Sequence, residues 1–136
     1  MPTRDEMDAL QRFGRRYGVV APVTVELERA VLGSDHGANG YAPREQVETL
    51  IGVLAMRPGE RLLDVGAGCG WPGVYIAGRT GCRAVVADLP MQGMRRAQER
   101  ITADALRGSA AVVATARRLP FRPASFDAVV HTDVLC

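Results

Sequence analysis

The chain contains no lysine, and all 17 of its basic residues are arginine. A P-loop needs a lysine that reaches the nucleotide phosphates, and Schiff-base chemistry needs a lysine amine, so both kinds of site are excluded. The formal net charge is only +2. Arginine pairs such as Arg95–Arg96 are interpreted as solvated surface, and no nucleic-acid partner is expected.

Cysteine is scarce, and long apolar runs are missing. The three cysteines, Cys69, Cys82 and Cys136, are odd in number and form no C-x-x-C pair. We therefore expect neither a disulfide framework nor a metal site. No apolar run approaches the length of a membrane span, and the amino terminus lacks the pattern of a signal peptide. These features predict a cytoplasmic protein without a membrane span.

A glycine-rich turn is the most informative feature that is present. The short apolar run 62–65 breaks into glycines at positions 66, 68 and 70, and a helical pattern resumes after Pro72. This order predicts a strand, a tight turn and a helix. Glycine admits positive φ and lets a ligand approach the backbone, at the strand end where open α/β sheets bind ligands. The turn is predicted to seat a cofactor.

The spacing of the glycines bears on which cofactor is bound. The dinucleotide fingerprint G-x-G-x-x-G, counted from Gly66, requires glycine where this chain has Trp71. A nicotinamide-dependent oxidoreductase is therefore disfavoured, although Asp88 alone would permit one.

Two aspartates accompany the turn. Asp88 ends a second apolar run about 20 residues after Gly68, where a carboxylate can accept two hydrogen bonds from a ribose diol. The alternative is that Asp88 caps the helix ahead of Pro90. Asp64 lies inside the first predicted strand, and a buried carboxylate there needs a partner. That partner is either the ammonium end of a cofactor or the amides of the turn.

Four segments in order resemble the class I S-adenosylmethionine (SAM)-dependent methyltransferases. Residues 62–70 look like the first motif of that family, and residues 85–89 look like its second strand with the acidic residue for the ribose. Residues 119–121 and 125–130 are similar to the L-P-F…S-F-D-x-V signature of its small-molecule branch. Because order and spacing agree, the resemblance is more specific than a lone glycine turn.

The resemblance implies SAM as cofactor and a small-molecule or lipid-like methyl acceptor. The cofactor-binding residues that it implies are Tyr41, Asp64, Gly66, Ala67, Gly68, Gly70, Asp88, Leu89, Thr115, Ala116 and His131. Tyr41 is equally well explained as a packed aromatic at a helix start. Where the family often has an acidic residue for the adenine amino group, this chain has Thr115, so the Thr115 hydroxyl or the Ala116 backbone would make that contact. His131 is the candidate general base.

Strands and helices alternate from residue 61 onward. The expected strands are 61–65, 83–88, 110–115 and 126–132, and the expected helices between them are 72–79 and 91–105. Such alternation predicts an α/β protein with a parallel sheet and right-handed crossovers. With the resemblance, the expected fold is the Rossmann-like methyltransferase fold with a partial sheet of about four strands.

The two ends of the chain lead to separate expectations. Helices are expected at 5–17 and 24–32, and residues 1–42 are expected to be an amino-terminal helical cap. Residues 43–136 are expected to form the SAM-binding domain that follows it. The chain stops after the fourth predicted strand, where resembling enzymes continue. We therefore expect a truncated enzyme, or a sheet that self-associates through the open edge of that strand. A noncatalytic SAM-binding remnant is the alternative function.

Overall fold

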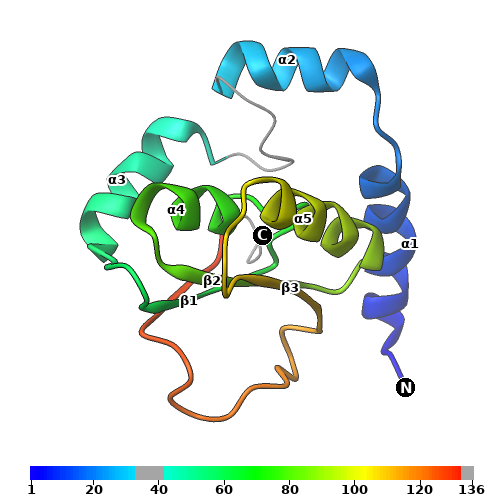
Figure 1. Ribbon diagram of the computed structural model, residues 1–136. Coiled ribbons are helices and arrows are strands. Elements are labelled where there is room, and N and C mark those ends of the chain that lie inside the picture. The colour runs from blue at the N-terminus through cyan, green and yellow to red at the C-terminus, as the bar shows by residue number, and fades with distance from the viewer. Residues whose placement is uncertain (33–41, 133–136) are drawn as a thin grey trace.

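The structure is a computed structural model that describes residues 1–32 and 42–132. Its centre is a sheet of four strands in the order β3-β2-β1-β4 (Figure 1). The strands are β1 (Arg61–Val65), β2 (Arg83–Asp88), β3 (Ala110–Val113) and β4 (Ala128–Val130). All neighbouring pairs are parallel. The expected α/β fold with a parallel four-stranded sheet is thereby confirmed.

The two outer strands are shorter than predicted. After β3, the Ala114 N–H still donates to the carbonyl of Asp88 at 3.0 Å, but the chain then turns, and Thr115 lies beyond the strand. Before β4, the Asp127 carboxylate accepts the N–H of Arg61 at 2.7 Å. The N–H of Asp127 also donates to the carbonyl of Arg61 at 2.8 Å, and β4 begins one residue later.

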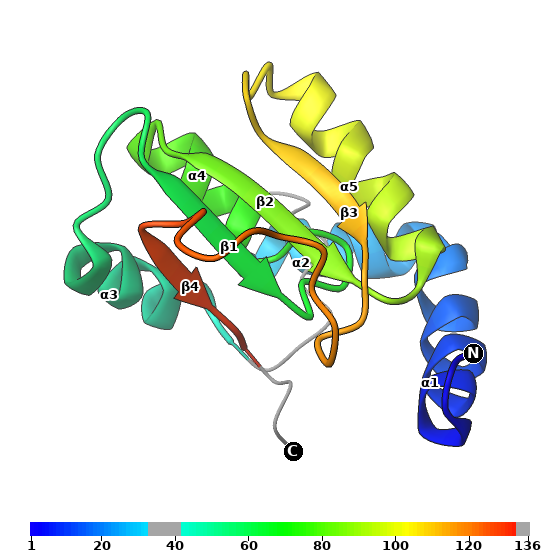
Figure 2. The same ribbon diagram turned by 90° about the horizontal axis from the view of Figure 1, so that it is seen from below.

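Two helices, α4 (Gly73–Thr80) and α5 (Met91–Ala103), cover one face of the sheet, and α3 (Arg44–Leu54) packs beside α4. The view from below shows that the segment between β3 and β4 crosses the opposite face (Figure 2). The core lies between the sheet and the helices, where apolar side chains are excluded from water and contribute most of the stability. Its fully buried members include Val47, Leu62, Ile76, Ala84 and Val86.

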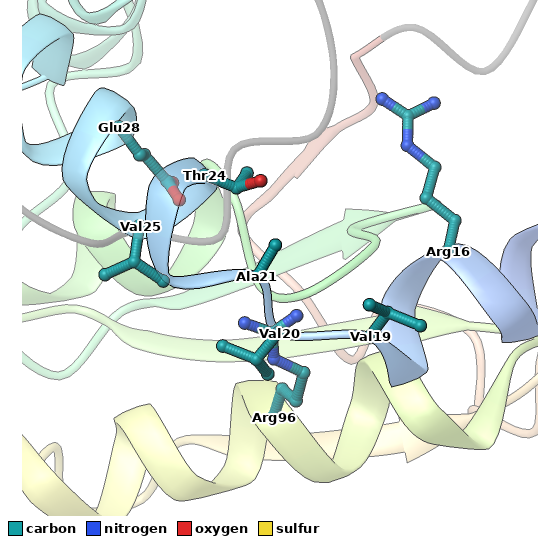
Figure 3. Close-up of a pocket in the computed structure, with 8 residues that line it drawn as sticks. All are labelled: Arg16, Val19, Val20, Ala21, Thr24, Val25, Glu28 and Arg96. Atoms are coloured by element: carbon teal, nitrogen blue, oxygen red, sulfur yellow. The ribbon is translucent and has the colours of Figure 1, made fainter.

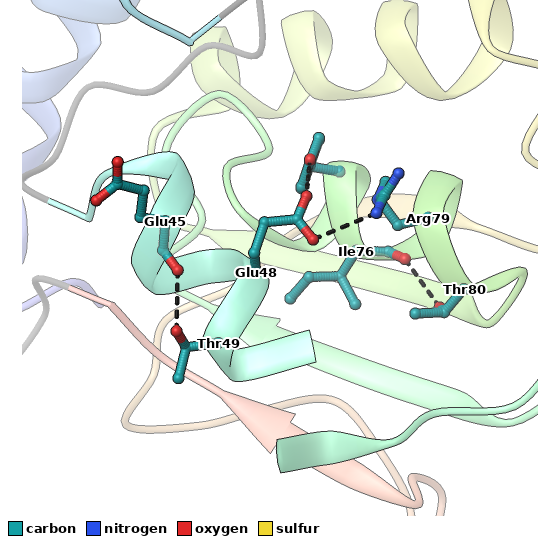
Figure 4. A network of polar contacts seen from close by, with 7 residues as sticks. Glu45, Glu48, Thr49, Ile76, Arg79 and Thr80 are labelled. Carbon is teal, nitrogen blue, oxygen red and sulfur yellow. Dashed lines mark hydrogen bonds and ion pairs between the residues drawn. The ribbon is translucent and has the colours of Figure 1, made fainter. Parts of the chain in front are cut away.

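A polar contact joins α3 to α4 at the edge of this core (Figure 4). The carboxylate of Glu48 accepts hydrogen bonds from the hydroxyl of Tyr75 and, at 3.3 Å, from the guanidinium of Arg79. The hydrogen bond from Tyr75 lowers the pKa of Glu48, and the positive charge of Arg79 contributes in the same direction. The contact fixes α3 beside the helix that follows the glycine turn.

Two further helices precede this domain: α1 (Arg4–Gly18) and α2 (Pro22–Leu32). Helix α1 begins with a capping box, in which Thr3 and Glu6 each bind the backbone N–H of the other. It packs against α5 and stands beyond the carboxyl end of β3 (Figure 2). Within the described ranges, no helix is both long enough and apolar enough to cross a membrane.

Candidate functional site

The turn between β1 and α4 is built by glycines in conformations that other residues rarely adopt. Gly66, Gly68 and Gly70 have φ values of 74°, 59° and 105°. The amides of Gly66 and Ala67 both donate to the carbonyl of Ala87 in β2, at 2.7 and 3.2 Å. The turn is thus bonded to the neighbouring strand at the carboxyl edge of the sheet, the edge at which parallel sheets bind ligands.

Asp88 lies at the same edge. One of its carboxylate oxygens accepts the N–H of Gly68 at 2.8 Å, and the other accepts the N–H of Leu89 at 2.7 Å. Partial burial raises the pKa of Asp88, whereas these two hydrogen bonds favour the charged form. The helix cap that was the alternative for this residue is not formed, because Pro90 occupies the cap position of α5 and Asp88 binds the turn instead.

Asp64 is completely buried beneath the start of α4. Its Oδ2 accepts the N–H of Gly73 at 2.7 Å, while Oδ1 has no hydrogen-bond partner among the described residues. Burial raises the pKa of Asp64 to about 8, although the bond from Gly73 acts against that shift. One half of the carboxylate therefore braces the backbone after the turn, and the other half is an acceptor to which no described residue donates.

Helix α5 holds the turn from the opposite side. Arg100 donates to the carbonyl of Cys69 at 2.7 Å. A Cβ on Gly93 would lie 2.2 Å from the carbonyl oxygen of Gly68, and one on Gly70 would lie 3.1 Å from the Cβ of Ala97. Glycine at position 93 is thus required by the close approach of α5 to the turn, not by its own backbone angles.

Helix α1 covers the turn from outside. The ring of Tyr17 is buried, and a Cβ on Gly68 would lie 3.2 Å from its hydroxyl oxygen. Burial raises the pKa of Tyr17 to about 12, and the nearby charge of Asp88 adds to the shift. Arg96 of α5 donates to the carbonyl of Tyr17 at 3.2 Å and holds this end of α1 in place. The amino-terminal helix therefore forms part of the site.

The other end of α1 reaches the residues after β3. The hydroxyl of Thr115 donates to the carboxylate of Glu6 at 2.6 Å, across 109 positions of sequence. Ala116, the next residue, is exposed. An acidic side chain thus stands beside the position at which the resembling family often has its own acidic residue.

The remaining predicted site residues fall in different places. His131 follows β4 directly and is exposed; because Val130 pairs with Asp64, His131 lies level with the end of β1. The structure therefore brings the turn, Asp88 and His131 to one edge of the sheet. Tyr41 lies outside the described residues.

Sequence reasoning missed the contributions of α1 and α5. Four residues contact the turn or its surroundings yet lie 31 to 109 positions from their partners in sequence: Glu6, Tyr17, Arg96 and Arg100. Only Gly93 carried a signal, since a glycine inside a helix costs stability and usually has a packing reason.

A cavity of about 270 Å³ lies beside the end of α1, and its lining includes Arg96, which donates to the carbonyl of Tyr17. Figure 3 shows that residues from the end of α1, the α1–α2 connection, α2 and α5 surround it. Its wall combines apolar side chains with three charged groups. The lining residues are Arg16, Val19, Val20, Ala21, Thr24, Val25, Glu28 and Arg96.

Comparisons with known proteins agree on one family. Residues 63–136, more than half of the chain, match the family described as a methyltransferase domain. Among curated proteins, the chain is similar to methyltransferase GfsG of Streptomyces halstedii, at 27% identity over 94% of this chain and 50% of the relative. The chain thus spans about half the length of the curated relative that it matches.

Solved structures share the fold. A SAM-dependent methyltransferase from Thiobacillus denitrificans, in complex with S-adenosylhomocysteine, superposes with a TM-score of 0.61 at 19% identity, covering 84% of this chain and 44% of that one. An N-methyltransferase from Haemonchus contortus was solved with phosphomonomethylethanolamine and S-adenosylhomocysteine. It superposes with a TM-score of 0.69 at 22% identity, and the match covers 96% of this chain and 28% of that one. These likenesses show the Rossmann-like methyltransferase fold.

Proposed function

This chain belongs to the methyltransferase domain family, the class I SAM-dependent enzymes, and from that premise we propose that it transfers the methyl group of SAM to a small-molecule or lipid-like acceptor. The observation that carries the proposal is the bond between the Asp88 carboxylate and the Gly68 amide. It joins the acidic group expected at the ribose to the glycine turn expected at the amino-acid part of SAM, at the edge where such sheets bind ligands.

The residues present fit SAM. The buried Oδ1 of Asp64, to which no described residue donates, is an acceptor for which the ammonium group of SAM is a suitable donor. Asp88 is half-buried, so its carboxylate is available to ribose hydroxyls. Because Gly66 has no Cβ, the turn carries no side chain there toward a ligand, whereas the ring of Tyr17 covers Gly68.

The chemistry demands little of the protein beyond alignment. Bound SAM supplies a methyl group on a positively charged sulfur, which an acceptor atom displaces in line. The protein's part is to hold the two reactants in that line and to exclude water, which the packing of α1 over the turn favours. We propose His131 as the base for an acceptor that must lose a proton, because its place level with the end of β1 puts an imidazole at this edge.

A small acceptor is favoured by the cavity beside the end of α1. About 270 Å³ suits a small molecule, and the lining combines two arginines, Arg16 and Arg96, and one glutamate, Glu28, with apolar valines. The Haemonchus contortus enzyme, which shares the fold, was solved with phosphomonomethylethanolamine, itself a small acceptor with a charged group. We propose that the acceptor of this chain has an apolar body and an anionic group.

The first test is calorimetric titration of the chain with S-adenosylhomocysteine. Micromolar binding would support the cofactor site, and transfer of a labelled methyl group from SAM to members of an acceptor panel would support the activity. Binding without transfer to any acceptor would favour the alternative, a noncatalytic SAM-binding module. Absence of binding by a folded chain would contradict the proposal for this chain.

A further inference from the structure

The carboxylate of Glu6 is held at the end of β3 by two hydrogen bonds. Its Oε1 accepts the hydroxyl of Thr115 at 2.6 Å, and its Oε2 accepts the N–H of Thr3 at 2.8 Å. The side chain is only partly buried, so a ligand can reach it. The hydrogen bond from Thr115 lowers the pKa of Glu6, which keeps the group charged and therefore an acceptor only.

The place of Glu6 relative to Asp88 follows from the strand register. Asp88 pairs with Val113 across β2 and β3, and Thr115 stands two residues beyond Val113. Helix α1 runs along the carboxyl ends of three strands. Glu6, near its start, bonds to Thr115 after β3, and Tyr17, near its end, lies against Gly68 after β1. A nucleoside whose ribose binds Asp88 therefore has the end of β3, and with it Glu6, beside its base.

We propose that Glu6 is a specificity residue for the cofactor, and that its carboxylate accepts a hydrogen bond from the exocyclic amino group of adenine. This inference rests on the proposed function. An amino group that enters the site loses water and needs an acceptor, which a fixed carboxylate supplies. A base with an oxygen at that position would instead face a negative charge and be rejected.

The role of Thr115 changes accordingly. The sequence predicted that its hydroxyl, or the Ala116 backbone, contacts the adenine. In the structure, the hydroxyl already donates its proton to Glu6 and accepts the N–H of Arg117 at 3.3 Å. We assign it the part of a positioning residue, which orients Glu6 toward the base.

The experiment compares two ligands by calorimetry. S-adenosylhomocysteine carries the amino group, and S-inosylhomocysteine carries an oxygen in its place. We expect the wild type to prefer S-adenosylhomocysteine, and Glu6→Gln to reduce the ratio of the two affinities by roughly tenfold or more, as for a hydrogen bond to a charged group. Gln keeps the shape of the side chain but offers both a donor and an acceptor.

The matched control is Thr3→Ala, which breaks the capping box but leaves the Glu6 carboxylate and Thr115 in place. If Glu6 merely fixes α1, both variants will weaken the two ligands equally and leave the ratio unchanged, which overturns the inference. Should Glu6→Gln fail to fold, Thr115→Val provides the same test, with a smaller expected fall in the ratio. If the wild type binds neither ligand, the proposed function itself is wrong and the inference fails with it.

Discussion

The carboxylate of Asp88 accepts the N–H of Gly68 at 2.8 Å, so the end of β2 is bonded to the middle of the glycine turn that follows β1. The second carboxylate oxygen accepts the N–H of Leu89, which fixes the orientation of the side chain before any ligand arrives. Site geometry that is set in advance reduces the free energy lost on binding. Asp88 thus has both a structural and a proposed binding role.

Replacing Asp88 with alanine should abolish measurable binding of S-adenosylhomocysteine. The variant loses the proposed ribose acceptor and leaves the amide of Gly68 without its partner, so we expect an affinity loss of at least roughly a hundredfold. Asp127→Ala is the control. The Asp127 carboxylate also accepts a backbone N–H, that of Arg61, but at the amino ends of the strands. Calorimetry on both variants measures the difference. Equal losses of affinity in the two variants would mean that Asp88 acts only through stability. Binding of a nicotinamide dinucleotide to the protein would contradict SAM as its cofactor.

Gly93→Ala should disrupt the turn. Its Cβ would lie 2.2 Å from the carbonyl oxygen of Gly68, so α5 or the turn has to move. We expect destabilisation of about 1–3 kcal/mol, as for other overpacked sites, together with weaker binding of S-adenosylhomocysteine. Gly52→Ala in α3 is the control, since a Cβ built there meets no described atom within 4 Å beyond its chain neighbours and the backbone of its own helix. It should raise stability by up to about 1 kcal/mol in urea unfolding, because alanine favours helix. Equal changes in stability for Gly93→Ala and Gly52→Ala would contradict the close approach of α5 to the turn.

Asp64 should make the unliganded protein less stable as the pH rises. Its pKa of about 8 in the folded state lies above the 3.8 of an ordinary aspartate, so between these values the folded state binds the extra proton. The free energy of unfolding then falls with increasing pH, by at most about 1.4 kcal/mol per pH unit. Urea unfolding from pH 5 to 8 should show this slope to be smaller in Asp64→Asn. Parallel curves for the two proteins would show that Asp64 ionises normally.

Filling the cavity beside the end of α1 should impair acceptor binding without affecting the cofactor. Val25→Trp places a large ring inside the cavity, whereas Val23→Trp, on the same helix at a residue that is 70% exposed, does not. Once an acceptor is known, we expect Val25→Trp to raise its KM roughly tenfold, with unchanged affinity for S-adenosylhomocysteine. Identical kinetics for both tryptophan variants would place the acceptor elsewhere.

Self-association through β4 stays a prediction. Among the described strands, β4 pairs only with β1, and its Val129 is 56% exposed. A free apolar edge favours pairing with a second copy. Sedimentation should therefore show dimers that Val129→Arg abolishes, whereas Val113→Arg at the other edge, on β3, should leave them intact. A wild-type monomer at micromolar concentration would contradict this prediction.

Local sequence was sufficient to predict the turn and the order of the elements around it. Apolar runs that contain β-branched residues predict buried strands, and the glycines between them permit the φ values found at Gly66 and Gly68. The ends of the strands were predicted less well, because Asp127 and the turn after Thr115 end the ladders through contacts outside the strands themselves.

The surroundings of the turn were beyond sequence reasoning. The apolar spacing of Met7, Leu10 and Phe13 predicted this helix, but Met7 is 57% exposed, whereas Gly14 and Tyr17 are buried. The helix packs through small residues against Gln92 of α5, a contact that no periodicity indicates. The place of Tyr17 over Gly68 therefore emerged only from the packing.

The sequence by itself determined the glycine turn, the two aspartates and the alternation of strands and helices, because backbone freedom and burial depend on residue type and on near neighbours. Tertiary structure alone decided which groups meet at the carboxyl edge of the sheet. Glu6 reaches Thr115 across 109 positions because α1 docks on α5, and such docking depends on the fit of whole surfaces. Local pattern thus specified the glycine turn, and packing between distant segments supplied the walls around it.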